Sequence, residues 1–582
     1  MNNTPCYSFS ITHCQINPMP LPNIELPPKY YLTYFEYLLN FVEAKYAHIL
    51  NEEERNFITN FKLLSEDEKC LFVRFSNRKG VFFKTDKLNY TEIDDIPKAL
   101  NSLKIKGFLH EIESIKVEHF LLIGLLEIFT KPELLAFLKT LQIETKGLSG
   151  LKKESILDFC IENTIQKPWL AVLPKNIVHL GFETETMMLK FLFFGNRHAE
   201  MTEFVIRDLG IMKYQEFDED KLVAQFATRQ EAEDKLKVSL AKEDFYTMQA
   251  AQIDPQNIYI WFDDWAATQK NILDPSVLPN YERLVVKVGM YLEKQKLYQE
   301  ALSILRLTKL APSRERQVRV LQKINHLDEA KALCEILLGD FQNADERFFA
   351  IDFLEKLSSK KRTKKAVTQQ LHNSESIAIP LDWKYQVEAG VIDYYEQQGH
   401  RAFFAENHLW KSIFGLLFWD IVFDTNAMAI HHPLQRSPSD LYKPIFWENR
   451  RNKLLERLEI LNDPADWQVY IEQIFFEKHG TTNPLVEWFP GIFEAVNVVL
   501  SKIEAPKMAK IMLEMAKNMK ENTRGFPDLF MWTADGYSFV EVKSPTDNLS
   551  NQQLYWLHYF EEIGVNSKVL RVTWEDTNLN FT

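Results

Sequence analysis

The sequence predicts a mostly helical, multidomain protein with an α/β domain at its C-terminus. The 582-residue chain exceeds the ~250–300 residues that one hydrophobic core usually organises, so about three or four domains are expected. Apolar residues recur at helical spacing through most of the chain, whereas β-forming residues gather between residues 527 and 574. We place an N-terminal region at residues 1–165, a helical domain at 166–380 and the α/β domain at 381–582.

Composition points to a soluble protein of a reducing compartment. No stretch approaches the ~20 apolar residues of a membrane span, and the opening MNNTPCYSFSITHCQ lacks the basic and apolar segments of a signal peptide. The cysteines form neither a CxxC pair nor a zinc pattern with histidine: Cys6, Cys14, Cys70, Cys160 and Cys334. A cytoplasmic location is therefore expected. Since the net charge is -13, any surface for nucleic acid has to be local.

The N-terminal region reads as helices followed by a basic hairpin. Residues 29–50, KYYLTYFEYLLNFVEAKYAHIL, have the periodicity of an amphipathic helix. Two further helices, ERNFITNFKLL and EDEKCLFVRF, are expected before a hairpin around Asn77 to Gly80, and the helix DIPKALNSLKIKGFL follows. This order is similar to a winged-helix module. A small α+β packing domain is the alternative.

Residues 132–162 predict a small helical hairpin. Two short amphipathic helices are joined by a loop that carries glycine and lysine. The pattern resembles a SAP motif, which sits on the DNA backbone, and Lys146, Lys152 and Lys153 would contact phosphates. An ordinary helical hairpin without DNA contact is the alternative.

The central domain carries a faint helical repeat. The segments LYQEALSIL and HLDEAKALCEIL place Glu-Ala steps at residues 300–301 and 329–330. Small alanines where helices cross suit a TPR-like solenoid. The offset of 29 residues is shorter than the ~34 of that repeat, so either the repeat is degenerate or a different helical pair is present.

Basic residues gather at two places in this domain. Arg314, Arg316 and Arg319 lie close together, and the run KLSSKKRTKK covers residues 356–365. Such runs are usually solvated helix ends or loops. Next to a domain that acts on nucleic acid they become candidate phosphate contacts.

The stretch PDLFMWTADGYSFVEVK, residues 527–543, predicts a β-hairpin that presents charges. The β-forming runs DLFMWT and YSFVEVK flank the turn residues ADG. Because side chains alternate along a strand, Glu541 and Lys543 share one face and Val542 points to the other. Pairing across the turn brings Asp528 close to Glu541.

Two neighbouring carboxylates in an apolar element suggest a metal site. Burying both costs several kcal/mol unless a cation intervenes. Mg2+ and Mn2+ prefer oxygen ligands, so Asp528, Glu541 and the carbonyl of Val542 are candidate ligands. Lys543 would then orient or deprotonate an attacking water, or hold a phosphate. The alternative is a surface ion pair between Glu541 and Lys543, with Asp528 at a strand end.

The order of elements after the hairpin extends the pattern. Pro545 and the segment from Asp547 to Ser550 end the strand, QQLYWLHYFEEI predicts a helix and VNSKVLRVTW another strand. Strand, turn, strand, helix, strand is the core of restriction-endonuclease-like nucleases, here with the spacing PD-x12-ExK. The segment PDLFMWTADGYSFVEVKSPTDNLSNQQLYWL, preceded by Arg524-Gly525, resembles the VRR-type nuclease domain of the PD-(D/E)XK superfamily.

The resemblance extends upstream. GHRAFFAENHLWKSIFGLLFWDIVFD is similar to the Fanconi-associated nuclease family, in which a metal-ligand glutamate opens this helix; here it is Glu406. On a helix Glu406 would share a face with Trp410, Ile413 and Leu417. A first-turn glutamate that complements the helix dipole is the alternative. Segments from about residue 25 to 575 match the family in order.

Membership would imply a metal-dependent, structure-specific DNA nuclease. The family acts as a 5' flap endonuclease and 5'-3' exonuclease in interstrand-crosslink repair. Glu406, Asp528, Glu541 and Val542 would bind Mg2+ or Mn2+, and Lys543 would position the nucleophile. The family's ubiquitin-binding zinc finger is absent, which is typical of a compact prokaryotic form, cytoplasmic and nucleoid-associated. A catalytically weak DNA-junction scaffold and an RNA-directed nuclease on the same fold are the alternatives.

The resemblance also implies a basic pocket for a 5'-terminal phosphate. Lys520 and Arg524 lie in the segment before Pro527, and Arg314 or Arg316 would supply the solenoid's share. Two glutamines follow the hairpin in the next helix. Gln553 matches a family glutamine that would hold the active-site water or Lys543. Gln552 replaces a frequent family lysine, which lowers the expected charge of the pocket.

Overall fold

A computed structural model describes most of the chain and divides it into two compact units. The described residues are 25–86, 88–112, 119–164, 172–269, 272–358, 370–461 and 463–575. Within them, the N-terminal unit comprises residues up to 44, 51–190 and 198–213, and the C-terminal unit comprises 45–50, 191–197 and those from 214 onward. Each unit is described by itself.

The N-terminal unit opens with the expected helices. They are α1 (Tyr30–Tyr46), whose last residues belong to the other unit, α2 (Glu52–Lys62), α3 (Glu66–Ser76) and α4 (Ile96–Ile105). Asn51 and Ser65 each begin a helix through a capping box, with Glu54 and Glu68 as the reciprocal partners. These caps satisfy backbone N–H groups that a helix start otherwise leaves unpaired.

The small sheet of this unit differs from the predicted hairpin. Strand β1 (Phe82–Lys84) pairs with β3 (Ile177–Leu180), which also pairs with β2 (Leu109–Glu111), all antiparallel. The expected local hairpin around Asn77 to Gly80 is therefore wrong. Helix α3 runs to Ser76, and the apolar strand that completes the sheet comes from much later in the chain.

The helical hairpin at residues 132–162 is confirmed as α6 and α7. The further helices of this part are α5 (His119–Glu127), α6 (Lys131–Thr140), the 3-10 turn η2 (Leu148–Gly150), α7 (Lys153–Thr164), α8 (Glu183–Phe194) and α9 (Thr202–Asp208). Leu134 and Leu138 from α6 pack with Ile156 and Cys160 from α7 in one apolar cluster. Burial of this shared face holds the two helices together.

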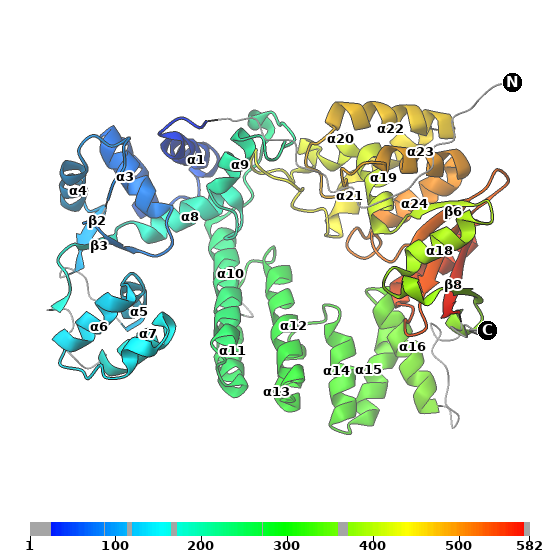
Figure 1. The fold of residues 1–582 in the computed structure, drawn as a ribbon, viewed down its shortest axis with the longest axis horizontal. Helices are drawn as coiled ribbons and strands as arrows, with labels where there is room; N and C mark the ends of the chain where they lie inside the picture. Colours follow the sequence, from blue (N-terminus) through cyan, green and yellow to red (C-terminus); the bar gives the residue numbers. More distant parts are fainter. Residues whose placement is uncertain are drawn as a thin grey trace, which may run out of the picture. The chain divides into compact units, whose positions relative to one another are not determined.

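Successive helices form the central part of the C-terminal unit (Figure 1). They are the 3-10 turn η4 (Glu219–Lys221), α10 (Arg229–Ala250), α11 (Pro255–Gln269), α12 (Leu278–Lys294), α13 (Tyr298–Leu305), α14 (Ser313–Lys323), α15 (Leu327–Gly339) and α16 (Ala344–Ser358). Ala301 and Ala330 are fully buried, as the repeat predicts. A Cβ on Gly289 would lie 2.6 Å from Leu305, so α12 and α13 cross closely.

The nuclease-like part follows with one mixed sheet and its helices. The elements are β4 (Glu375–Ile379), η5 (Leu381–Tyr385), α18 (Val387–Glu396), β5 (Arg401–Phe404), α19 (Asn407–Leu417), α20 (Trp419–Val422), η6 (Thr425–Ala427), α21 (Ile445–Ile460), α22 (Pro464–Lys478), α23 (Ile492–Lys502), α24 (Ala505–Lys517), β6 (Leu529–Trp532), β7 (Tyr537–Lys543), α25 (Asn551–Ile563) and β8 (Ser567–Trp574). The predicted hairpin, helix and last strand are confirmed as β6, β7, α25 and β8.

The sheet has the order β4-β8-β7-β6-β5. Strands β4, β8 and β7 are parallel neighbours, while β5 and β7 each pair antiparallel with β6. Val540 and Val542 face α18 in an apolar cluster, so the alternate residues of β7 point to the opposite face. On that face Phe526 stacks between Trp410 of α19 and Trp556 of α25, at 4.9 and 4.1 Å between ring centroids.

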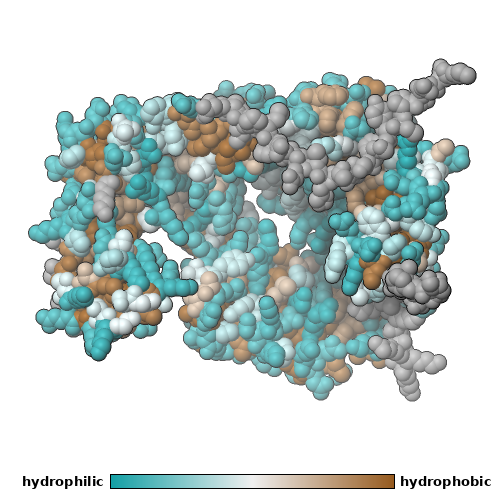
Figure 2. All heavy atoms as spheres, in the orientation of Figure 1, coloured by the Kyte–Doolittle hydropathy of each residue, from teal (hydrophilic) through white to brown (hydrophobic). Residues whose placement is uncertain are grey.

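One face of the molecule is mostly polar. Hydrophilic residues cover most of the face seen in Figure 2. Among the described residues, no helix combines the length and the apolar character that a bilayer crossing needs. The described cysteines Cys70, Cys160 and Cys334 are buried and form no disulfide with one another, whereas Cys6 and Cys14 lie outside the described residues.

Candidate active site

Strand register brings the two carboxylates of the hairpin together. Leu529 pairs with Val540, so Asp528 and Glu541 are the next residues across the ladder. Asp528 Oδ2 accepts a hydrogen bond from the backbone N–H of Val542 at 2.8 Å. The convergence of Asp528 with Glu541, predicted from the turn and the period of two, is thus present in the structure.

The pairing of β5 with β6 brings Glu406 close to Asp528. Phe404 of β5 pairs with Leu529, and the N–H of Ala405 donates to the Asp528 carbonyl at 2.7 Å. Glu406 therefore lies beside Asp528, as the N-cap residue of α19 with its side chain exposed. The expected helix face is wrong, because Glu406 precedes the helix and Trp410 points into the core.

Glu541 is the most enclosed of the three carboxylates, with none of its surface exposed. Its Oε1 accepts hydrogen bonds from Lys543 Nζ at 2.7 Å and from Gln553 Nε2 at 2.5 Å. Its Oε2 is buried and has no hydrogen-bond partner among the described residues. Burial, and then repulsion from Asp528, raise the pKa of Glu541 to about 8.

The pKa of the Asp528 carboxyl is raised as well. Burial raises the pKa of Asp528 to about 6, although the Val542 N–H and the Lys543 ammonium act in the opposite direction. The carboxylates of Glu388 and Glu406 add to the increase. Excess negative charge is thus concentrated around Asp528 and Glu541.

These residues fit a divalent cation. Glu541 Oε2 is a buried acceptor without a donor, and a cation would offset the burial and the repulsion from neighbouring carboxylates that raise the pKa values of Asp528 and Glu541. Glu406 adds an exposed carboxylate, with one hydrogen bond from Asn407 at 3.1 Å. No ready-formed cluster of three or more His, Cys, Asp or Glu ligands occurs in the described parts of the chain. Internal hydrogen bonds hold Glu541 Oε1 and Asp528 Oδ2 instead.

Gln553 has a definite task at this site. Its Oε1 accepts from the Ser550 N–H at 2.8 Å, which completes a capping box at the start of α25. Its Nε2 holds Glu541 rather than Lys543 or a water as predicted. The side chain thus fixes one carboxylate oxygen and leaves the other oxygen open.

Two residues that the sequence did not single out also belong to the surroundings. Asn407 donates to Glu406 Oε1 and accepts from the N–H of Phe526 at 3.3 Å, so it connects Glu406 to the segment before Asp528. Glu388 of α18 lies close enough to raise the pKa of Asp528. Asn407 directly follows Glu406 in the chain, which is the one signal that could have identified it.

Comparison with known proteins agrees with this geometry. Residues 29–110 match the family model described as FAN1, HTH domain, and residues 462–574 match the VRR-NUC domain. A Fanconi-associated nuclease 1 homolog of Pseudomonas aeruginosa is 26% identical over 96% of this chain and 98% of its own length. Fanconi-associated nuclease 1 of Mus musculus is 24% identical over 97% of this chain and 65% of its own length.

A solved structure aligns over almost the whole chain. The crystal structure of paFAN1 bound to 2nt 5'flap DNA with gap has a TM-score of 0.80 and 25% identity, and the match covers 95% of this chain and 100% of that one. This chain is similar to the Fanconi-associated nucleases over almost its whole length, and it carries FAN1-type HTH and VRR-NUC domains. Its VRR-NUC domain makes it a metal-dependent nuclease, with Asp528 and Glu541 inside the matched segment.

The family's expected phosphate pocket involves basic residues before Asp528. Lys520 is exposed and lies 3.5 Å from Glu521. Arg524 pairs with Glu521 and lies 3.8 Å from Asp345 of α16. Asn551 of α25 also contacts Asp345, at 3.0 Å. Arg524 therefore lies where the solenoid meets the nuclease domain.

The solenoid arginines are mostly engaged. Arg314 is buried and donates to Glu346 at 2.8 Å and to Asp340 at 3.0 Å. Arg316 is partly exposed and lies 3.7 Å from Glu293. This placement favours a structural role for Arg314 and leaves Arg316 as the more accessible of the two. Residues 359–365 of the basic run lie outside the described residues.

The SAP-like lysines differ among themselves. Lys146 and Lys152 are exposed in the loop between α6 and α7. Lys153 donates to the carbonyl of Glu127 at 2.8 Å and so connects α7 to the end of α5. Lys146 and Lys152 are therefore more available than Lys153 to contact a phosphate.

Proposed function

We propose that this chain cuts DNA at 5' flaps by metal-dependent phosphodiester hydrolysis. The observation that carries the proposal is the double register of β5, β6 and β7, which places Glu406 beside Asp528 and Asp528 beside Glu541, whose Oε2 has no partner among the described residues. Lys543 is held beside them. Paired carboxylates next to a lysine are suited to holding a cation against a phosphate and placing a nucleophile.

The metal would be Mg2+ or Mn2+, which prefer hard oxygen ligands. Glu406, Asp528, Glu541 and the carbonyl of Val542 would hold it. When bound, the ion offsets charge on the phosphate and lowers the pKa of a water molecule.

The chain's own groups supply the positioning. Gln553 and Lys543 fix Glu541 Oε1, so the carboxylate is held in one orientation and Oε2 remains available as a ligand. The Val542 N–H fixes Asp528 in the same way. Lys543 is largely buried and keeps its ammonium at the carboxylates, where it would orient the attacking water or stabilise charge that develops on the phosphate.

The DNA structure cut is inferred from a relative. The solved paFAN1 structure contains 5' flap DNA, and its chain aligns with this one over nearly its full length. We infer that Lys520, Arg524 and Arg316 approach the 5' end, while Lys146 and Lys152 contact the duplex backbone. Exonuclease action in the 5'-3' direction, interstrand-crosslink repair and a cytoplasmic, nucleoid-associated location belong to the same proposal.

Cleavage of a labelled 5' flap duplex in Mn2+ tests the assignment. Asp528→Asn keeps an oxygen for the Val542 N–H but removes the negative charge, so cutting should fall by at least ~100-fold. Asp535→Asn is the matched control, because Asp535 is exposed in the turn of the same hairpin and should cut normally. Equal cutting by the two variants would refute the site. Absence of cutting by the wild type would favour the junction scaffold.

A further inference from the structure

A cavity of about 460 Å³ lies in the C-terminal unit, away from the carboxylates of the active site. Its walls come from α10, the start of α12, the loop at residues 426–445 and the first turn of α21. The proposed nuclease reaction uses none of these residues. Polar side chains and several apolar ones, such as Val277 and Ile445, share the lining.

Two lysines of this cavity have ammonium groups without a hydrogen-bond or ion-pair partner in the described part of the chain. Lys235 of α10 and Lys443 of the loop line it, and neither ammonium group makes a hydrogen bond or ion pair with any residue that the structure describes. The Lys235 ammonium lies 5.0 Å from the centre of the Phe226 ring, a cation–π contact that does not neutralise its charge. An isolated, partly buried cation of this kind costs free energy unless an anion pairs with it.

The surrounding charges leave the cavity positive. Arg283 adds a third cation near both lysines. The carboxylates on the lining are Glu231 and Asp440. Glu231 already accepts hydrogen bonds from Ser276 Oγ and the Ala227 N–H, at 2.9 and 2.8 Å.

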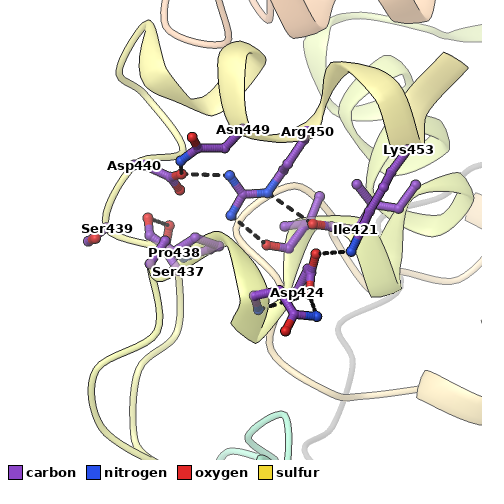
Figure 3. Close-up of polar contacts among 12 residues, drawn as sticks. Ile421, Asp424, Ser437, Pro438, Ser439, Asp440, Asn449, Arg450 and Lys453 are labelled. Carbon is purple, nitrogen blue, oxygen red and sulfur yellow. Dashed lines mark hydrogen bonds and ion pairs between the residues drawn. The ribbon is translucent and has the colours of Figure 1, made fainter. Parts of the chain in front are cut away.

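One oxygen of the Asp440 carboxylate accepts hydrogen bonds from side chains of α21. Arg450 donates to its Oδ2 at 2.5 Å and to the carbonyl of Ile421 at 2.9 Å (Figure 3). The Asn449 amide reaches the same Oδ2. Arg450 thereby offsets the charge of Asp440 and fixes its orientation.

The other oxygen of Asp440 is buried and unsatisfied. Asp440 is only 5% exposed, yet its Oδ1 has no hydrogen-bond partner among the described residues. A buried acceptor without a donor is costly, and in a cavity wall it marks a place for a donating group of a ligand. The cavity thus offers an unpaired acceptor together with unpaired cations.

The first turn of α12 adds partial positive charge to the cavity wall. Val277 precedes the helix, and no side chain caps this start. Ser276, Val277 and Asn280 from this turn line the cavity. The N-terminal end of a 17-residue helix carries a partial positive charge that favours a phosphate group.

The pKa values are consistent with an unpaired cluster. Burial, followed by repulsion from Lys443, lowers the pKa of Lys235 to about 8. Burial and the nearby Arg283 lower the pKa of Lys443 as well. An anion between the two ammonium groups would remove this repulsion.

We propose that this cavity binds a nucleoside phosphate, with the phosphate against Lys235 and Lys443 and a donor of the base or sugar against Asp440 Oδ1. The volume is within the range of ligand pockets, which hold about 300–1,000 Å³. The amides of Asn280 and Asn426 suit the mixed donors and acceptors of a base edge. The ligand is either a free mononucleotide or the terminal nucleotide of a strand.

Calorimetric titration of the full chain with deoxyadenosine 5'-monophosphate tests the proposal. EDTA keeps the nuclease site free of metal, so failure here is independent of flap cutting. Saturable binding is expected, and deoxyadenosine and inorganic phosphate should each bind at least about tenfold more weakly. Absence of saturable binding, or equal affinity for inorganic phosphate alone, would overturn the proposal.

Matched lysine variants assign the binding to the cavity. Lys235→Met keeps the packed stem and should weaken binding by at least about tenfold, as should the exposed Lys443→Met. Lys242→Met on the same helix, two turns away and outside the lining, should bind as the wild type does. If Lys235→Met and Lys242→Met bind equally, the proposal is wrong.

A competition arm identifies the source of the ligand. A short single strand with a 5'-phosphate is titrated against the bound mononucleotide. Displacement that depends on Lys235 supports the terminal nucleotide of a strand. Retention of the mononucleotide supports a free nucleotide as the ligand of the same cavity.

Discussion

Replacement of Arg314 distinguishes a buried structural ion pair from a phosphate contact. The Arg314 side chain is 4% exposed and the Glu346 side chain 0% exposed. Arg314→Met removes both hydrogen bonds to Glu346 and leaves a buried carboxylate with one backbone donor, the N–H of Gln342. The change therefore creates an uncompensated buried charge between α14 and α16.

The size of the effect follows from burial. Breaking a buried pair by removing one partner costs about 3–5 kcal/mol. The second partner, Asp340, is 74% exposed, and its pair with Arg314 adds only about 0–1 kcal/mol. In Arg314→Met with Glu346→Met, both charges are absent, so most of the loss should be recovered.

Hydrogen exchange is the appropriate assay because a multidomain chain does not unfold in one step. Amides of α14 to α16 should lose about 3–5 kcal/mol of protection in Arg314→Met. Arg319→Met is the control on the same helix, since Arg319 is 45% exposed and its pair with Glu315 contributes less than about 1 kcal/mol. Unchanged protection together with weakened binding of 5'-phosphorylated DNA would refute the structural role and assign Arg314 to the phosphate.

Three further outcomes are expected. Gln553→Leu frees Glu541 and should lower the rate of flap cutting by about 10–100-fold with little change in KM. Gly525→Ala should lower the melting temperature and the cutting rate, because the φ of Gly525 is +80° and a Cβ would lie 2.8 Å from the side chain of Gln552. Gly536→Ala is the control, since a Cβ there meets open space and the change should be neutral in both assays. A hydrogen bond from Lys84 of β1 lowers the pKa of Glu133 to about 2. The contribution of Glu133 to stability is therefore complete above about pH 4.5 and is lost as the pH falls toward 2. Hydrogen-exchange protection of α6 should lose this acid dependence in Glu133→Gln.

Local patterns predicted the parts of the site that lie close in sequence. Turn residues and the period of two were sufficient to place Asp528 next to Glu541 and Lys543, because a tight hairpin fixes its own register. The same holds for α2 and α3, whose capping residues are visible in the sequence. Each of these features is decided by neighbours a few residues away.

Pairing between distant segments could not be predicted in this way. Glu406 joins the site because β5 pairs with β6, and β1 finds its partner in β3 instead of a local hairpin. Nothing in a strand's own residues specifies which distant strand completes its ladder, since backbone hydrogen bonds are the same for every partner. Resemblance to a family supplied Glu406, whereas the helix-face argument placed it on the wrong element.

Contacts between distant segments also determine which cations remain available to bind a ligand. Arg314 lies in a basic cluster typical of a phosphate contact, yet Glu346, far along the chain, neutralises it completely. Lys235 lies in an ordinary amphipathic helix next to Asp234, and it is the one left unpaired, because Asp234 bonds to Gln230, Lys237 and the Asp274 N–H. Charge density along the sequence therefore says little about binding. The free energy available to a ligand resides in the groups that folding buries without a partner.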